Sequence, residues 1–265
     1  MDQSKPIGVL DSGVGGLSLF RTIREQLPNE ALIYVADSGY APYGDKCEAW
    51  IAERSAQVIA FLVGQGCKAV VIACNTITTV AVNRLRETFD IPIIAIEPAI
   101  KPAVAMTKSG VIAVMATTRT LSSESLQRLR NRVAGEVEVI FVPCPGLAER
   151  VESADLVSPE VHHLLTNLLT PALSKGADIL VLGCTHYPFL TDAIQAVAGS
   201  GVQVVDPSAA VVEELKRKIC ALNMLAPCTN AGIATFWSSG GTAQAQVVVQ
   251  SLLGYRQAIS KLPEL

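Results

Sequence analysis

Short apolar runs alternate along the chain with longer stretches in which apolar residues recur at helical spacing. The apolar runs, each typical of a buried strand, cover residues 7–10, 32–36, 69–73, 91–96, 111–115, 137–142, 179–182 and 202–205. The helix-like stretches cover residues 17–26, 48–62, 79–89, 122–132 and 160–173. This alternation predicts an α/β fold with mainly parallel sheets, because parallel neighbours are joined by crossovers that are usually helices.

The first three apolar runs resemble the fifth to the seventh, which suggests an internal repeat. Gly8 matches Ile112, Ile33 matches Ile140 and Val71 matches Val181, with each run ending in small or polar residues. Chance similarity between apolar strands would give a similar pattern. A real duplication predicts two similar α/β domains that face each other, with Cys74 and Cys184 ending equivalent strands.

The boundary between the copies falls near Glu97-Pro98, before a helix-like stretch at 99–106. A further amphipathic stretch covers 209–222, and 234–239 is typical of a last strand. These final residues have no counterpart in the repeat, so we expect them to pack back on the first copy. The predicted domains are therefore residues 1–98 plus 208–265, and residues 99–207.

Composition narrows the classes of function. Half of the residues are hydrophobic, 17% are charged and only 5% are aromatic, which favours the aliphatic core of a parallel α/β protein. A net charge of −3 with scattered Lys and Arg argues against nucleic acid as a partner. No apolar stretch approaches the ~18 residues of a membrane span, and no signal sequence precedes residue 7, so we expect a cytoplasmic protein.

Seven cysteines form no CxxC pair, and a reducing compartment would keep them as thiols. Two of them, Cys74 and Cys184, follow buried-looking strands at the sheet edge where α/β proteins bind ligands. A helix beginning just after each would lower the thiol pKa and offer donors to a carboxylate. Two small buried hydrophobic residues would give the same spacing. The other five lack metal-ligand spacing and are interpreted as structural or incidental: Cys47, Cys67, Cys144, Cys220 and Cys228.

Other candidates lie in loops near the predicted strand ends. Asp11 heads a glycine-rich loop that lacks the spacing of a dinucleotide loop, and its charge would repel a pyrophosphate. The glycines Gly13, Gly15 and Gly16 suit either tight turns or ligand contact. The loop 41–44 could place a phenol and backbone amides over a pocket. His186 is well placed to act with Cys184, whereas His162 and His163 lie in a predicted helix.

Four segments, taken together, resemble bacterial glutamate racemases of the aspartate/glutamate racemase superfamily: residues 8–17, 42–44, 73–76 and 182–188. The resemblance covers nearly the whole chain. It implies two similar α/β domains related by a pseudo-twofold axis, with the active site in the cleft between them. It also implies no pyridoxal phosphate or other cofactor, no metal, and production of D-glutamate for peptidoglycan. Dimers are usual in that family, so a homodimer is also an expectation.

Carried over position by position, the resemblance makes Cys74 and Cys184 the paired acid and base. It places Asp11 beside the first thiol, and Glu152 and His186 beside the second, as auxiliary groups. The substrate contacts it implies are Asp11, Ser12, Tyr43, Gly44, Asn75, Thr76, Thr117, Thr120, Thr185 and His186. By the same resemblance, Cys74 works on the D-glutamate face and Cys184 on the L-glutamate face.

Some positions depart from the family pattern. Ile77 stands where many members have alanine, and Ala116 and Ala154 stand where glycine is usual. The usual Ser-Gly-Asp near the C-terminus is Ser239-Gly240-Gly241. These changes bear on the pocket shape and leave every catalytic group in place.

Racemisation without a cofactor needs a base on one face of Cα and an acid on the other, and thiols suit both roles near neutral pH. The alternatives left open are an aspartate or hydantoin racemase of the same superfamily, a non-catalytic amino-acid-binding or regulatory protein, and a thiol redox protein. A binding protein needs no paired thiols, and the absence of CxxC disfavours redox chemistry.

Overall fold

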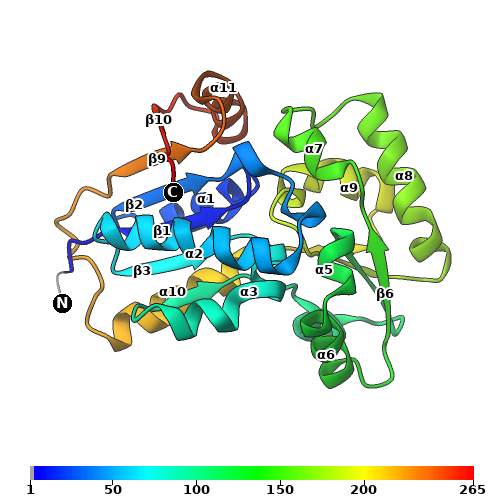
Figure 1. Ribbon diagram of the computed structural model, residues 1–265. Helices are drawn as coiled ribbons and strands as arrows, with labels where there is room; N and C mark the ends of the chain where they lie inside the picture. The colour runs from blue at the N-terminus through cyan, green and yellow to red at the C-terminus, as the bar shows by residue number, and fades with distance from the viewer. Residues whose placement is uncertain (1–2) are drawn as a thin grey trace.

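The structure, a computed structural model, describes residues 3–265, and its strands form two separate parallel sheets (Figure 1). The first sheet contains β1 (Ile7–Asp11), β2 (Leu32–Ala36), β3 (Ala69–Ile72), β4 (Ile93–Ala95), β9 (Ala234–Ser238) and β10 (Ile259–Lys261). The second contains β5 (Val111–Ala116), β6 (Glu138–Pro143), β7 (Ile179–Leu182) and β8 (Gln203–Val205). The prediction of an α/β fold with parallel sheets is confirmed, since every strand pair in both sheets is parallel.

The helices connect consecutive strands and cover the sheets. Those of the first sheet are α1 (Leu17–Gln26), α2 (Glu48–Gly64), α3 (Asn75–Thr88), α10 (Ser208–Ala221) and α11 (Thr242–Leu253). Those of the second are α4 (Ile100–Met106), α5 (Thr118–Ser122), α6 (Glu124–Val133), α7 (Leu147–Glu152), α8 (Pro159–Ser174) and α9 (Thr191–Ala198). Three short 3₁₀ helices follow strand ends: η1 (Ser38–Tyr40), η2 (Tyr43–Asp45) and η3 (Tyr187–Leu190).

Strand order reveals the repeat that the sequence suggested. The order β2-β1-β3-β4 in the first sheet corresponds to β6-β5-β7-β8 in the second. β3 and β7 are therefore equivalent, and Cys74 and Cys184 each lie two residues beyond the end of their strand. The C-terminal strands β9 and β10 extend the first sheet beyond β2, as expected for the segment outside the repeat. The domain boundaries at residues 98 and 207 stay a prediction.

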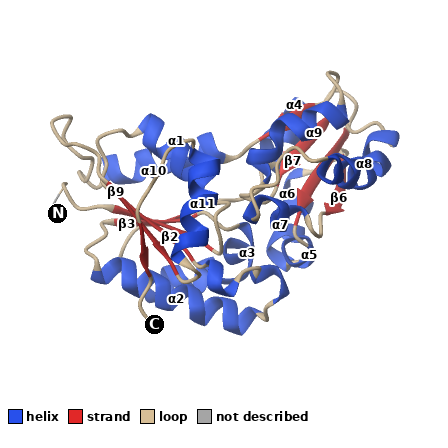
Figure 2. Ribbon diagram, turned by 90° about the horizontal axis from the view of Figure 1, so that it is seen from above, coloured by secondary structure: helices blue, strands red, loops and turns tan. Residues whose placement is uncertain are grey.

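Alternate side chains of the strands enter cores on opposite faces of each sheet. In β1, Ile7 and Val9 pack on the side of α1 and α10, whereas Leu10 packs with α2 and α3 (Figure 2). In β5, Val114 packs with α4, α5 and α6, whereas Met115 packs with α8 and α9. Burial on both faces explains why the strands read as continuous runs of Val, Ile and Leu.

The elements that sequence periodicity missed are mostly short. The strand β10 has three residues, and α5, α7 and α9 have five, six and eight, too few for a helical period to stand out. The helix α11 contains Val247, Val248 and Val249 in a row, a pattern more typical of a strand. The helix α3 begins at Asn75, four residues before the predicted start, because Cys74 has an extended backbone and serves as its N-cap. No helix within residues 3–265 is long and apolar enough to cross a membrane.

Asp178, just before β7, ties the turn before β5 to the second sheet. Its carboxylate accepts hydrogen bonds from the Thr107 hydroxyl and from the backbone N–H groups of Lys108 and Ser109. Although partial burial acts in the opposite direction, these donors lower the pKa of Asp178 to about 2. The carboxylate therefore stabilises the fold above its unfolded pKa of ~3.9, and this contribution is lost as the pH falls toward 2.

We expect Asp178→Ala to lower the free energy of unfolding at pH 7 by about 1 kcal/mol, a figure kept small because the group is partly exposed. Urea denaturation should show the deficit shrinking between pH 4 and pH 2. The control is Glu136→Gln, an exposed acid in the turn before β6. An equal loss of stability in both variants at pH 7 would contradict this role for Asp178.

Candidate functional site

A cavity of about 350 Å³ lies at the carboxyl ends of both sheets and is lined by residues from each. All the site residues predicted from the sequence line it except Asp11: Ser12, Tyr43, Gly44, Cys74, Asn75, Thr76, Thr117, Thr120, Glu152, Cys184, Thr185 and His186. The two chain halves of the repeat thus contribute opposite walls of one cavity.

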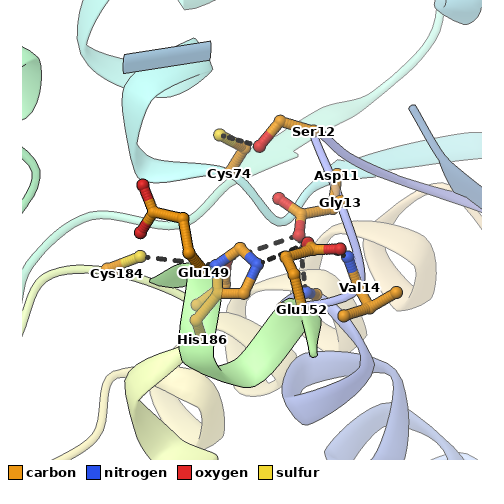
Figure 3. Close-up of polar contacts among 12 residues, drawn as sticks. Asp11, Ser12, Gly13, Val14, Cys74, Glu149, Glu152, Cys184 and His186 are labelled. Atoms are coloured by element: carbon orange, nitrogen blue, oxygen red, sulfur yellow. Dashed lines mark hydrogen bonds and ion pairs between the residues drawn. The ribbon is translucent and has the colours of Figure 1, made fainter. Parts of the chain in front are cut away.

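The two thiols enter this cavity from equivalent positions. Cys74 is 5% exposed, and its Sγ lies 3.4 Å from Ser12 Oγ (Figure 3). Cys184 is 8% exposed, and its Sγ lies 3.5 Å from His186 Nδ1. The thiols are close enough for a charge on Cys184 to raise the pKa of Cys74. Each thiol therefore has its own polar neighbour and faces a shared space.

Burial raises the pKa of the Cys74 thiol to about 12, and the charge of Asp11 adds to this effect. Hydrogen bonds from Ser12 and from the backbone of Ile77 oppose the rise without cancelling it. The N-terminus of α3 acts in the expected direction through the Ile77 N–H, but burial outweighs it and the pKa of Cys74 is raised overall. The helix that follows Cys184 is the short 3₁₀ helix η3, and α9 begins only at Thr191.

Glu152, His186 and Cys184 form a chain of polar contacts. His186 Nε2 lies 2.7 Å from Glu152 Oε1, which also accepts a 2.8 Å hydrogen bond from the backbone N–H of Val14. Burial lowers the pKa of His186, but contacts with Cys184 and Glu152 outweigh burial and hold it well above its ordinary value. Burial raises the pKa of Glu152, but the His186 contact lowers it overall. The geometry therefore favours an imidazolium between a carboxylate and a sulfur.

The glycines after β1 allow side chains of the second chain half to approach this loop closely. Gly15 and Gly16 lie in the turn closed by the hydrogen bond from Leu17 N–H to the Val14 carbonyl, but neither they nor Gly13 has a positive φ, so backbone conformation alone does not require glycine there. A Cβ on Gly13 would overlap Glu152 Oε1, and one on Gly15 would lie 2.5 Å from His186 Nδ1. The loop can therefore receive the Glu152 and His186 side chains of the second chain half only because residues 13 and 15 are glycines without side chains.

Asp11 lies beneath the cavity surface and is fully buried. Its Oδ2 accepts a 2.7 Å hydrogen bond from the N–H of Gly16 and a weaker contact at 3.5 Å from Thr185 Oγ1. Its Oδ1 has no hydrogen-bond partner within residues 3–265. Burial raises the pKa of Asp11, although the nearby His186 charge opposes the rise. A buried carboxylate oxygen is thus left for a donor that the protein itself does not supply.

Amides and hydroxyls line the other side of the cavity. Both amide atoms of Asn75 are buried and have no hydrogen-bond partner in the described part of the chain. Thr76 Oγ1 lies 3.2 Å from the hydroxyls of both Thr117 and Thr120, and so links the start of α3 to the end of β5. Unpaired amide groups in a cavity wall are available for a polar ligand.

Tyr43 lines the cavity, but its phenol is directed elsewhere. The hydroxyl donates a hydrogen bond to Asp37, and the side chain is 1% exposed. The idea that the loop presents this hydroxyl to a ligand is therefore not supported, because the hydroxyl is engaged by Asp37, although Tyr43 and Gly44 both line the cavity. The structure shows further lining residues that the sequence did not single out: Ser38, Ala41, Pro42, Ala148, Glu149, Ser153, Gly183 and Gln244.

Glu149 is the most polar of these additional residues. It lies one helical turn before Glu152 on α7, a spacing that places both side chains on the same helix face (Figure 3). This i, i+3 spacing from Glu152 was the one feature of the amino-acid sequence that could have pointed to Glu149. Within residues 3–265, no group of three or more His, Cys, Asp and Glu side chains could hold a metal ion.

Comparisons with known proteins agree with this architecture. The family model for Asp/Glu/Hydantoin racemase matches residues 7–215. A glutamate racemase of Ectopseudomonas mendocina is 48% identical over 257 residues, covering 96% of this chain and 97% of that protein. Among solved structures, glutamate racemase isoform RacE1 of Bacillus anthracis aligns with a TM-score of 0.88 at 29% identity, covering 98% of each chain.

The glutamate racemase of Escherichia coli, in complex with L-glutamate and the activator UDP-MurNAc-Ala, aligns with a TM-score of 0.85 at 33% identity, covering 98% of this chain and 99% of that one. The family match, the high identity to a relative over nearly the full length and the shared two-sheet architecture all indicate the same family. The chain therefore belongs to the Asp/Glu/Hydantoin racemase family, which confirms the resemblance drawn from its motifs.

Proposed function

We propose that the protein is a glutamate racemase that interconverts L- and D-glutamate without a cofactor and supplies D-glutamate for peptidoglycan. The observation that carries the proposal is the pair of thiols, Cys74 and Cys184, which enter one cavity from equivalent strand ends. Racemisation requires an acid and a base on opposite faces of Cα, and a duplicated α/β unit supplies two such groups. The 48% identity to a glutamate racemase supports glutamate as the substrate.

In the proposed reaction, one thiolate removes the Cα proton and the opposite thiol donates a proton to the other face. The raised pKa of Cys74 keeps it protonated at neutral pH, so it begins as the acid when L-glutamate reacts. The His186 imidazolium would stabilise a thiolate at Cys184, which begins as the base on the L-glutamate face. For D-glutamate the roles reverse: Cys74 begins as the thiolate that remains once it has given up its proton, with Ser12 beside its sulfur, and Cys184 begins as the thiol.

Neutral donors would bind the substrate, since no Lys or Arg is among the residues lining the cavity. Asn75 and the hydroxyls of Thr76 and Thr185 would bind one carboxylate, and the backbone of Tyr43 and Gly44 the other. Asp11, buried beneath the cavity wall, would attract the substrate ammonium by its charge, without direct contact. Donors fixed before the reaction also stabilise the negative charge that develops when Cα loses its proton.

Incubation of purified protein with L-glutamate in D₂O, without pyridoxal phosphate or added metal, tests the proposal. We expect the optical rotation to be lost while deuterium enters Cα, and NMR measures that incorporation. Parallel rates with aspartate measure substrate preference. Folded protein that neither racemises glutamate nor exchanges its Cα proton would rule the function out, and a faster reaction with aspartate would reassign the substrate.

A substitution at Gly13 tests the contact between the loop after β1 and the Glu152 side chain. In Gly13→Ala, the new methyl group would push Glu152 away from His186 and from the N–H of Val14. We expect kcat/KM for glutamate to fall at least about tenfold, because a positioned proton-transfer partner is displaced. Gly201→Ala, in an open turn, is the control. Undiminished activity in Gly13→Ala would show that Glu152 need not hold this position.

We also propose that the enzyme is cytoplasmic and acts as a homodimer. Seven free cysteines, four of them buried, support a reducing compartment. Size-exclusion chromatography with light scattering measures the oligomeric state directly. A monomer at all concentrations would contradict the dimer.

A further inference from the structure

The loop between β2 and α2 reaches the cavity with few buried residues of its own. Between Asp37 and Ile51, Tyr43 is the only buried residue. The same loop supplies Ser38, Ala41, Pro42, Tyr43 and Gly44 to the cavity wall. A Cβ added at Gly44 would lie 3.6 Å from Thr117 Cβ, so the loop also approaches the wall formed by the second chain half. The position of this wall therefore depends on how firmly Tyr43 is held.

A buried ion pair holds Tyr43 from behind. Asp37 is fully buried at the end of β2 and accepts the hydrogen bond from the Tyr43 hydroxyl. Arg54, on α2, donates to both carboxylate oxygens of Asp37, with Nε at 2.8 Å from Oδ2 and Nη2 at 2.7 Å from Oδ1. Paired donation of this kind fixes the carboxylate in both direction and rotation. The acceptor for Tyr43 is thus immobilised by a helix on the far side of the loop.

Aromatic packing completes the support. The Trp50 ring meets the Tyr43 ring edge-on at a centroid distance of 5.2 Å. The Arg54 guanidinium lies over the Tyr40 ring, 4.4 Å from its centroid. Burial raises the pKa of Tyr43 far above its ordinary value, and the negative charge of Asp37 adds to this, so the phenol stays protonated and remains a donor. Neither Asp37 nor Arg54 lines the cavity, so neither can touch a bound substrate there.

We propose that Asp37 and Arg54 are positioning residues that set substrate affinity by holding Tyr43, and through it the loop wall of the cavity. The proposal rests on the proposed racemase function. Because the hydrogen bonds that the two thiols and the Glu152–His186 pair make within residues 3–265 involve no residue of this loop, loosening the loop should weaken substrate binding much more than proton transfer. The expected signature is a raised KM for glutamate with little change in kcat.

Two substitutions and their combination test the proposal in the full-length enzyme. Asp37→Asn removes the charge that Arg54 holds, and Tyr43→Phe removes only the phenol hydroxyl while leaving the ion pair intact. We expect each to raise KM for L- and D-glutamate about tenfold, with kcat within about threefold of the parent enzyme. Because both act through one hydrogen bond, the double variant should raise KM no more than the larger single effect.

A second buried ion pair in the same sheet provides a matched control. Lys68 and Glu30 pair at the opposite, amino-terminal ends of β3 and β2, with both side chains 1% exposed. Glu30→Gln is the same carboxylate-to-amide change as Asp37→Asn, and it also leaves a buried cation without its partner. We expect both variants to lower the melting temperature, but only Asp37→Asn to raise KM.

The outcomes separate the two levels of the proposal. If the parent enzyme does not racemise glutamate, the proposed function fails first. If it does, an unchanged or lowered KM in Tyr43→Phe, or an equal rise of KM in Glu30→Gln, overturns the positioning role. If Asp37→Asn does not fold, Tyr43→Phe still decides, because it leaves the Asp37–Arg54 pair in place.

Discussion

Replacing either Cys74 or Cys184 with alanine should lower the rate of glutamate racemisation at least about a thousandfold, the scale expected when an essential proton-transfer group is lost. Either variant keeps only one thiol in the cavity, so one face of Cα has no group to take or give a proton. Both side chains are small and sit at strand ends, so the fold should survive the change. The measurement is circular dichroism of glutamate over time, with Cys220→Ala, an exposed cysteine on α10, as the control.

The surviving thiol makes the prediction sharper. Cys74→Ala keeps Cys184, so it should still exchange the Cα proton of L-glutamate with D₂O while the product stays L. Cys184→Ala should exchange only D-glutamate, and more slowly, because burial raises the pKa of Cys74 to about 12. Full racemisation by either variant, or exchange of the wrong enantiomer, would contradict the assignment of one thiol to each face.

The long-range organisation of the chain could be predicted because it follows from repeated local patterns. Strands buried on both faces give continuous apolar runs, and the correspondence of Val71 with Val181 in the amino-acid sequence already places Cys74 and Cys184 at equivalent positions. The order of the strands confirms the equivalence. Periodicity detects such elements because burial dictates their composition.

The detailed environment of the site could not be predicted, because it depends on contacts between distant segments. The high pKa of Cys74 results from burial. The sequence indicates that a helix begins after Cys74, but it does not show how deeply the thiol is buried. The role of Gly13 depends on Glu152, 139 positions later, and the direction of the Tyr43 hydroxyl depends on Asp37 and Arg54. Gln244 comes from α11, outside the repeat, and no pattern connected it to the cavity.

The second large effect is expected for Glu152→Gln. The Glu152 carboxylate favours the imidazolium form of His186, so its removal should lower the His186 pKa. If the imidazolium supports the Cys184 thiolate, kcat/KM should fall about 10²-fold at neutral pH, and its alkaline limb should move to lower pH. Rate profiles between pH 6 and pH 10 measure both effects.

Glu149→Gln is the matched control for this experiment. It removes the same charge from the same helix, one turn earlier, whereas the hydrogen bond to His186 comes from Glu152. Its alkaline limb should stay where it is in the parent enzyme. An equal shift in both variants would show that general electrostatics of the cavity, and not the Glu152–His186 contact, sets the limb.

The equilibrium itself provides an internal check on these kinetics. The two enantiomers have equal free energy in water, so kcat/KM must be the same for L- and D-glutamate in every variant. Glu152→Gln acts on the Cys184 side alone, and it should therefore lower kcat/KM equally in both directions while changing kcat and KM differently for each. Unequal kcat and KM with an equal ratio would locate the defect on the Cys184 side of a shared two-thiol reaction. An equal fall in kcat for both enantiomers with unchanged KM would instead indicate a general loss of active enzyme, such as partial unfolding.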